Sequence, residues 1–170
     1  MKIGVFFGTN TGNTETVVEQ LEGILADNGF EVDVHDMASA SVDDFADYEN
    51  IIIACPTWND GELQDDWDAV MPELEEFDFT GKKVGFIGLG DQDGYPDNFL
   101  DALGIIWDVV EKNGGSLFGT WPTDGFEFDT SKAIRNDKFI GLGIDQDNQE
   151  DLTEDRLKQW VSQIKEELGA

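Results

Sequence analysis

Short apolar runs alternate along this chain with segments in which apolar residues recur every three or four positions. The short runs are rich in β-branched residues and are bounded by turn-forming residues, which predicts strands. Because Pro56 cannot donate a hydrogen bond to a neighbouring strand, we expect it to stop the third strand. The four predicted strands cover residues 3–7, 31–35, 51–55 and 84–89.

The intervening segments predict amphipathic helices, because their apolar residues fall on one face at helical spacing. Asn28-Gly29 ends the first helix, and Asn113-Gly114-Gly115 closes the third. Trp67, Val70 and Met71 begin a short helix that Pro72 kinks or ends. The apolar faces of the four predicted helices span residues 17–25, 67–71, 99–110 and 157–168.

A polar stretch between Gly119 and Lys138 has aromatic residues but no long period, and predicts an inserted loop or small flap. Leu117-Phe118 precedes this insertion, and an apolar run from Phe139 to Ile144 follows it. We therefore expect a fifth strand whose two pieces flank the insertion. Apolar strands separated by amphipathic helices predict one α/β domain over residues 1–170, a doubly wound five-stranded parallel sheet with helices on both faces.

Ligands of such sheets bind outside the carboxyl ends of the strands, so the loops after the first, third and fourth strands are the candidates. The first loop, Thr9-Asn10-Thr11-Gly12-Asn13-Thr14, offers hydroxyl, amide and backbone N–H groups and leads directly into a helix. A helix N-terminus carries unpaired N–H groups and partial positive charge, and so binds anions without a cationic side chain. The loop predicts a site for a terminal phosphate monoester.

Other interpretations of this first loop fit less well. A nucleoside triphosphatase loop needs Lys and then Ser or Thr after its second Gly, but Gly12 is followed by Asn13-Thr14. The G-x-G-x-x-G pyrophosphate pattern is absent after the first strand. An ordinary Thr/Asn-rich capping turn remains an alternative for this stretch taken alone.

The other two loops bring aromatic residues to the same sheet edge. Trp58 lies in the loop that follows the third strand, with Gly61 allowing the backbone to turn, although a Trp folded back on the core is the alternative. Tyr95 lies in the third loop, where Asp97 or Asn98 could cap the next helix. Two aromatic residues beside a phosphate loop predict a slot for a flat ring with a phosphate tail.

Charge and rare residues narrow the classes of function. The chain has 38 acidic against 10 basic residues, a net charge of -28, which argues against nucleic acid and anionic membranes and favours basic protein partners, solubility or a salty habitat. One cysteine, Cys55, excludes an internal disulfide, and we expect it to be buried filler. One histidine, His35, leaves His-based metal sites poorly supplied. There is no apolar run that would span a membrane and no signal-peptide pattern.

Four stretches along nearly the whole chain resemble flavodoxin, in the long-chain branch of that family. They are GTNTGNTE, PTWNDGELQDDW, GLGDQDGYPDNF and DTSKAIRNDKFIGLGIDQDNQEDLT. The resemblance implies strand order 2-1-3-4-5, for which flavodoxin is itself a known example with FMN at the switch point.

The resemblance also implies roles at an FMN site. The loop from Thr9 to Thr14 would bind the phosphate, Trp58 and Tyr95 would sandwich the isoalloxazine ring, and Asp147 would reach the ribityl hydroxyls. Asp91 and nearby backbone groups would address the pyrimidine edge, and the Asn59–Asp60 peptide would turn toward flavin N5 on reduction. The implied cofactor residues are Thr9, Asn10, Thr11, Gly12, Asn13, Thr14, Pro56, Thr57, Trp58, Asn59, Asp60, Gly61, Gly90, Asp91, Tyr95, Asn98 and Asp147.

The implied function is that of a low-potential one-electron carrier, not an enzyme, which shuttles between FMN semiquinone and hydroquinone. Its partners would be redox proteins with basic docking faces, such as photosystem I and a ferredoxin/flavodoxin–NADP reductase. We expect a monomer in the cytoplasm, or in the plastid stroma of an alga. Asp60 departs from the apolar or small residue common in the family, which bears on semiquinone stability.

Three other classes of protein need features that differ from these. A catalytic flavoprotein such as a quinone reductase needs a second substrate pocket beside the flavin. A signalling receiver domain needs an Asp at the end of the third strand and an acidic pair after the first, where this chain has Cys55-Pro56 and Gly8-Thr9. A non-redox interaction module would be colourless when purified.

Overall fold

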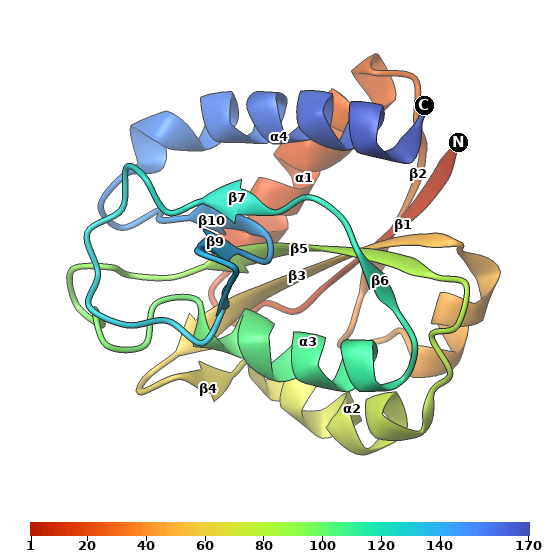
Figure 1. The fold of residues 1–170 in the computed structure, drawn as a ribbon, viewed down its shortest axis with the longest axis horizontal. Helices are drawn as coiled ribbons and strands as arrows, with labels where there is room; N and C mark the ends of the chain where they lie inside the picture. The colour runs from red at the N-terminus through yellow and green to blue at the C-terminus, as the bar shows by residue number, and fades with distance from the viewer.

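The computed structural model describes residues 1–170 and has a central parallel sheet (Figure 1). The main strands are β1 (Lys2–Phe7), β2 (Glu31–Asp36), β3 (Asn50–Trp58), β5 (Lys83–Leu89) and β10 (Leu142–Ile144). They lie in the order β10-β5-β3-β1-β2 and are all parallel. The predicted order 2-1-3-4-5 is confirmed.

The fifth position in the sheet is shared by two short strands that both pair with β5. β6 (Ser116–Leu117) pairs at the start of β5, and β10 pairs at its end. The chain between them forms a small antiparallel sheet of β7 (Trp121–Pro122), β9 (Lys138–Phe139) and β8 (Ile134–Arg135). The prediction that an insertion interrupts the fifth strand is therefore confirmed.

We expected the apolar run from Phe139 to Ile144 to form one strand, but the structure divides it between two strands. Its first residue belongs to β9 in the small sheet, and its last three residues form β10 in the main sheet. Between them the chain passes so close to β5 that a Cβ on Gly141 would lie 2.2 Å from the carbonyl oxygen of Phe86. Apolar character alone could not reveal this change of sheet, because both pieces are buried.

Two helices cover each face of the main sheet (Figure 1). α1 (Asn13–Asp27) packs beside α4 (Thr153–Leu168) on one face, and α2 (Asp65–Glu76) beside α3 (Asp101–Lys112) on the other. Two 3-10 turns, η1 (Val42–Asp47) and η2 (Glu150–Leu152), and the short strand β4 (Glu62–Leu63) complete the elements. Each face has its own apolar core, so the sheet is buried on both sides, as a parallel sheet requires.

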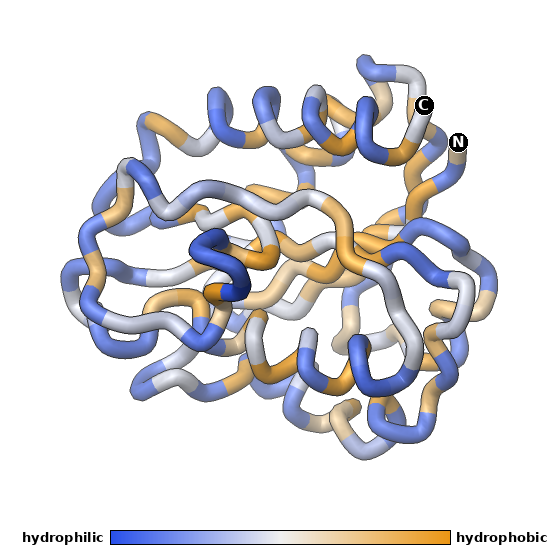
Figure 2. The backbone as a smooth tube through the Cα atoms, viewed as in Figure 1, coloured by the Kyte–Doolittle hydropathy of each residue, from blue (hydrophilic) through white to orange (hydrophobic).

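The tube coloured by hydropathy shows the same layering (Figure 2). Apolar colour runs along the strands, and the outer turns of the helices and the loops are mostly polar. Trp107 and Trp160 are buried, which confirms that they are core residues. None of the helices is both long enough and apolar enough to span a bilayer.

Neither proline ends its element, so the prediction that Pro56 stops the third strand is wrong, and of the two outcomes expected for Pro72 the end of the helix does not occur. β3 continues through Pro56 to Trp58, because the pairing of β3 with β1 stops at Ala54 and Pro56 pairs with β5 alone. α2 continues through Pro72 to Glu76. Pro72 and Asp68 are both exposed, so the Asp68 carbonyl group that Pro72 cannot pair with is near water.

Candidate functional site

A pocket of about 310 Å³ opens where the loops after β1, β3 and β5 meet. This is the carboxyl edge of the sheet, where the order of the strands reverses and ligands of such folds bind. The three loops selected from the sequence therefore lie together around one cavity. Its lining residues are Thr9, Asn10, Thr11, Asn13, Thr14, Pro56, Thr57, Trp58, Asn59, Leu89, Gly90, Asp91, Tyr95, Gln146 and Asp147.

The N-terminus of α1 forms one end of this pocket. Its N-cap is Gly12 at φ 89°, and no side chain caps the helix. Gly12 donates its backbone N–H to Thr9 Oγ1 over 2.9 Å, which closes the loop into a tight turn. The positive φ explains the glycine, since a residue with a Cβ would be strained there. The first N–H groups of α1 thus remain available to an anion in the pocket.

Asn10 lines the pocket, but its side-chain amide points toward α2. The Oδ1 atom accepts a hydrogen bond of 2.9 Å from Gln64 Nε2. The Nδ2 atom donates over 3.2 Å to Asp65 Oδ2. From the sequence we expected this amide to be a donor to an anion, whereas in the structure it connects the loop to the start of α2.

Two aromatic residues face the pocket, one from the end of a strand and one from a loop. Trp58 is half-buried at the end of β3, and Tyr95 lies in the loop after β5 with 44% of its surface exposed. The alternative that Trp58 is folded into the core is therefore wrong. Between the phosphate-type loop and these rings, the pocket offers both hydrogen-bond donors and flat apolar faces.

The turn that follows Trp58 is tightly constrained. Asn59 and Gly61 have φ values of 46° and 91°, and the chain then returns as β4, antiparallel to the end of β3. A Cβ on Gly61 would lie 2.8 Å from Asp101 Oδ2, so the turn packs directly against the start of α3. Asn98 donates to the same Asp101 oxygen over 3.0 Å.

Four of the predicted site residues, Gly12, Asp60, Gly61 and Asn98, do not line the pocket. Gly12 and Gly61 shape the two loops through their backbone, and Asn98 supports the 59–61 turn from behind through Asp101. Neither Asp97 nor Asn98 is the N-cap of α3, because that position is held by Leu100. Leu89 and Gln146 also line the pocket, and neither was predicted. The sequence did offer a signal for each, because Leu89 ends a strand and Gln146 precedes Asp147.

Three carboxylates, Asp91, Asp145 and Asp147, meet at the edge of the pocket with oxygens within 4.8 Å of one another. Hydrogen bonds from Gly94 N–H, then Asn148 and Asp93, lower the pKa of Asp91 against the opposing effect of burial. Burial first, and then the charges of Asp91 and Asp145, raise the pKa of Asp147. Asp91 is thus a fixed negative charge, whereas Asp147 accepts a proton more readily than an ordinary Asp.

Asp145 is fully buried and already holds four donor contacts. Its Oδ2 atom accepts from Gln92 N, Gln92 Nε2 and Asn148 Nδ2, and its Oδ1 atom accepts from Asn148 N. These contacts join the loop after β5 to the loop after β10. Asp145 therefore organises this side of the pocket through hydrogen bonds.

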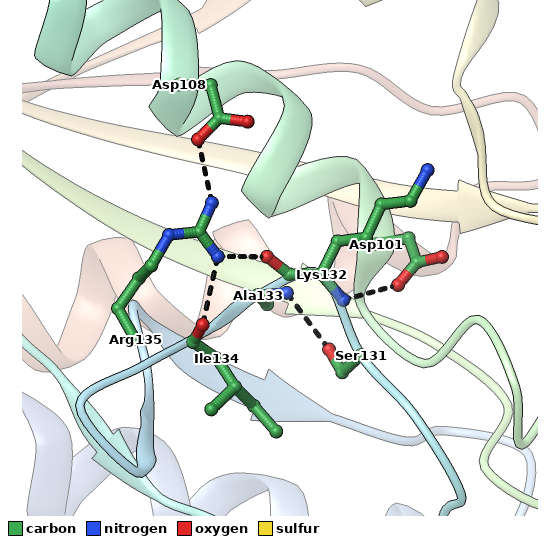
Figure 3. A network of polar contacts seen from close by, with 7 residues as sticks. All are labelled: Asp101, Asp108, Ser131, Lys132, Ala133, Ile134 and Arg135. Atoms are coloured by element: carbon green, nitrogen blue, oxygen red, sulfur yellow. Dashed lines mark hydrogen bonds and ion pairs between the residues drawn. The ribbon is translucent and has the colours of Figure 1, made fainter.

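The insertion reaches the site through the first turn of α3 (Figure 3). Asp101 Oδ1 accepts the backbone N–H of Lys132, and Arg135 pairs with Asp108, about two turns further along the helix. Because Asp101 also contacts Asn98 and the 59–61 turn, one buried carboxylate connects the insertion to the edge of the pocket.

Comparison with known proteins gives consistent matches over nearly the whole chain. The family model described as flavodoxin matches residues 5–160. A flavodoxin of Nostoc sp. strain PCC 7120 is 51% identical over 99% of this chain and 98% of its own. Flavodoxin 1 of Escherichia coli K12 is 46% identical over 97% and 93% of the two chains. The crystal structure of Fusobacterium nucleatum flavodoxin bound to flavin mononucleotide has a TM-score of 0.92 at 36% identity and covers 98% of both chains.

Proposed function

The chain belongs to the flavodoxin family, and we propose that it is a one-electron carrier that holds FMN non-covalently in the pocket between its three loops. The observation that carries this proposal is the uncapped N-terminus of α1 beside two aromatic side chains. The donors suit a phosphate, the aromatic faces suit a flat ring, and a cavity of about 310 Å³ falls in the usual range of roughly 300–1,000 Å³ for ligand pockets.

Each part of the pocket corresponds to a part of the cofactor. The loop from Thr9 to Thr14 would hold the phosphate, chiefly through backbone N–H and hydroxyl groups, because the Asn10 amide is engaged elsewhere. Trp58 and Tyr95, which line the pocket, would contact the two faces of the ring. Asp147 would address the ribityl chain, and Gly90 with Asp91 would address the pyrimidine edge, since all three line the pocket.

Bound FMN supplies the redox chemistry, and the protein sets its potential by position and charge. Asp60, Asp91, Asp93 and Asp147 belong to the loops around the pocket and oppose added negative charge. One charge at about 10 Å in a water-like dielectric contributes about 0.4 kcal/mol before screening. For one electron, this equals about 15–20 mV per carboxylate. Together the carboxylates lower the potential of the step that produces the anionic, fully reduced cofactor.

The distribution of charge supports docking to basic partners. There is no Lys or Arg between Ile3 and Gly81, a region that holds α1, β3, α2 and all of β1 except Lys2. Two of the three pocket loops lie in this region, so the cofactor edge is surrounded by uncompensated carboxylates. Such a field steers basic partners toward that edge. Suitable partners are photosystem I and a ferredoxin/flavodoxin–NADP reductase. The protein would act on them as a monomer, in the cytoplasm or in the plastid stroma.

A visible spectrum of the purified protein, followed by cofactor extraction, tests this function. We expect a yellow protein that releases one equivalent of FMN and shows two separate one-electron steps in a spectroscopic redox titration. Titration in a single two-electron step, or steady-state oxidation of NAD(P)H with quinones, would instead favour a catalytic flavoprotein. A colourless protein that does not take up added FMN would contradict the proposal.

A further inference from the structure

The geometry points to Gln64 as a positioning residue for the phosphate-binding loop, acting through Asn10. This inference rests on the proposed function, because it concerns how that loop is held for the FMN phosphate. Gln64 does not line the pocket and is fully buried. It lies within the PTWNDGELQDDW stretch, but the sequence alone assigned it no role at the site.

The side-chain oxygen of Gln64 has a fixed orientation. Gln64 is the N-cap of α2, and its Oε1 atom accepts backbone hydrogen bonds from Asp66 over 3.1 Å and from Trp67 over 3.3 Å. Since these donors cannot bond to an NH₂ group, the amide cannot rotate by half a turn without losing both. The Nε2 group must therefore face the opposite side.

The fixed Nε2 group in turn determines the orientation of Asn10. It donates to Asp66 Oδ2 over 2.8 Å and to Asn10 Oδ1 over 2.9 Å, which uses both of its hydrogens. Asn10 must then present its own NH₂ group to Asp65 Oδ2. The backbone of the loop at Asn10 is thereby held against the first turn of α2, although 54 residues separate Asn10 from Gln64.

Close packing around Gly8 strengthens this connection. A Cβ on Gly8 would lie 2.0 Å from Gln64 Oε1, so the loop leaves β1 in direct contact with the buried amide. Gly8 N–H and Trp67 Nε1–H both donate to the carbonyl oxygen of Ala54, at 3.3 and 3.1 Å. The strand end, the loop and α2 are thus joined at one point, and the phosphate-binding backbone is preorganised before any ligand arrives.

The test compares the affinities of Gln64→Met for FMN and for riboflavin, which lacks the phosphate. Met keeps the length of the side chain but removes its hydrogen bonds. We expect the Kd for FMN to rise about tenfold, as loss of roughly one hydrogen bond implies, and the Kd for riboflavin to change less than about twofold. Gln20→Met, on the exposed surface of α1, is the matched control and changes neither Kd.

An unchanged FMN affinity in Gln64→Met, or equal losses for FMN and riboflavin, would overturn the inference. Failure of the unmodified protein to bind FMN is a separate result, because it would overturn the proposed function itself. If circular dichroism shows that Gln64→Met does not fold, Asn10→Ala replaces it, since that change leaves the cap of α2 intact. The same selective loss for FMN is then expected, and its absence would contradict the role of the Gln64–Asn10 pair.

The double variant shows whether Gln64 acts through Asn10. In an Asn10→Ala background, Gln64→Met should weaken FMN binding no further, because the link is already broken. Fully additive losses would mean that the two side chains act independently, which would overturn the assigned route.

Discussion

The Oδ1 atom of Asp101 accepts a hydrogen bond of 2.7 Å from the backbone N–H of Lys132, and this contact fastens the insertion to the first turn of α3. Only 1% of the surface of Asp101 is exposed. Its other carboxylate oxygen accepts from Asn98 and lies against the Gly61 turn. The negative charge is also favoured by its place at the N-terminus of a helix. Asp101 therefore serves the insertion and the edge of the pocket together.

Replacing Asp101 by Ala should lower the free energy of unfolding by about 2–3 kcal/mol, because it leaves the Lys132 N–H and the Asn98 amide without a partner. Urea unfolding of the protein without cofactor measures the change. Asp108→Ala is the matched control, since it removes an exposed ion pair with Arg135 worth about 0–1 kcal/mol. Equal losses in the two variants would show that Asp101 has no special structural role.

Tyr95→Ala should weaken binding of oxidised FMN about tenfold or more, because an aromatic face contributes about a kcal/mol beyond its buried area. The potential of the second one-electron step should rise, since an electron-rich ring no longer opposes the anionic product. Fluorescence titration and a redox titration measure the two effects. Tyr95→Phe keeps the ring and should resemble the unmodified protein. An unaltered potential in Tyr95→Ala would remove Tyr95 from contact with the ring.

Asp60→Asn should raise the potential of the second one-electron step by about 15–20 mV at low ionic strength, because one negative charge near the cofactor is removed. The shift should shrink as salt is added. Asp27→Asn, at the far end of α1, is the control of equal charge and should give a smaller shift. If both variants shift the potential equally, net charge matters and the position of Asp60 does not.

Cys55 should make the protein less stable at high pH. Complete burial raises the pKa of its thiol from 9.0 to about 12. Above about pH 9 the unfolded chain loses this proton and the folded chain retains it, so the free energy of unfolding falls as the pH rises from about 9 to about 12. The slope from this group approaches about 1.4 kcal/mol per pH unit.

Urea unfolding of the unmodified protein and of Cys55→Ala at about pH 8, 9.5 and 10.5 tests this prediction. Together these pH values bracket the pKa of the thiol in the unfolded chain. The difference in stability between the two should narrow as the pH rises, because only the unmodified protein carries the thiol. A pH-independent difference would mean that the thiol ionises equally in both states. A thiol reagent should also leave native Cys55 unmodified and react after unfolding.

The order of the strands and the place of the pocket could be predicted because periodicity and loop chemistry are local features of the sequence. The end of β3 could not be predicted, because the effect of Pro56 depends on where β1 stops. The end of α2 could not be predicted either, because the effect of Pro72 depends on which side of α2 faces water. The 139–144 run was predicted as one strand, since its letters carry no sign of the change of sheet at Gly141.

The candidate site shows the same division. Its loops are contiguous in the sequence, so the pocket-lining residues Thr9, Trp58 and Tyr95 could be selected directly. Gln64 contacts the site from behind through its hydrogen bond to Asn10, 54 residues away in the chain. Asp101 supports the 59–61 turn and connects it to Lys132 of the insertion. A buried Gln or Asp at the start of a helix resembles any capping residue, and only the tertiary contacts distinguish it.

The absence of Lys and Arg between Ile3 and Gly81 also determines how the molecule can be cut. Trypsin has no target in that region, whether it is folded or unfolded. Lys132, Arg135 and Lys138 provide three targets within the insertion. In limited tryptic digestion of the intact protein, cleavage at these three residues therefore reports on the opening of the insertion. Trypsin cannot detect opening of the phosphate-binding loop, for which a protease that cleaves at acidic residues is needed.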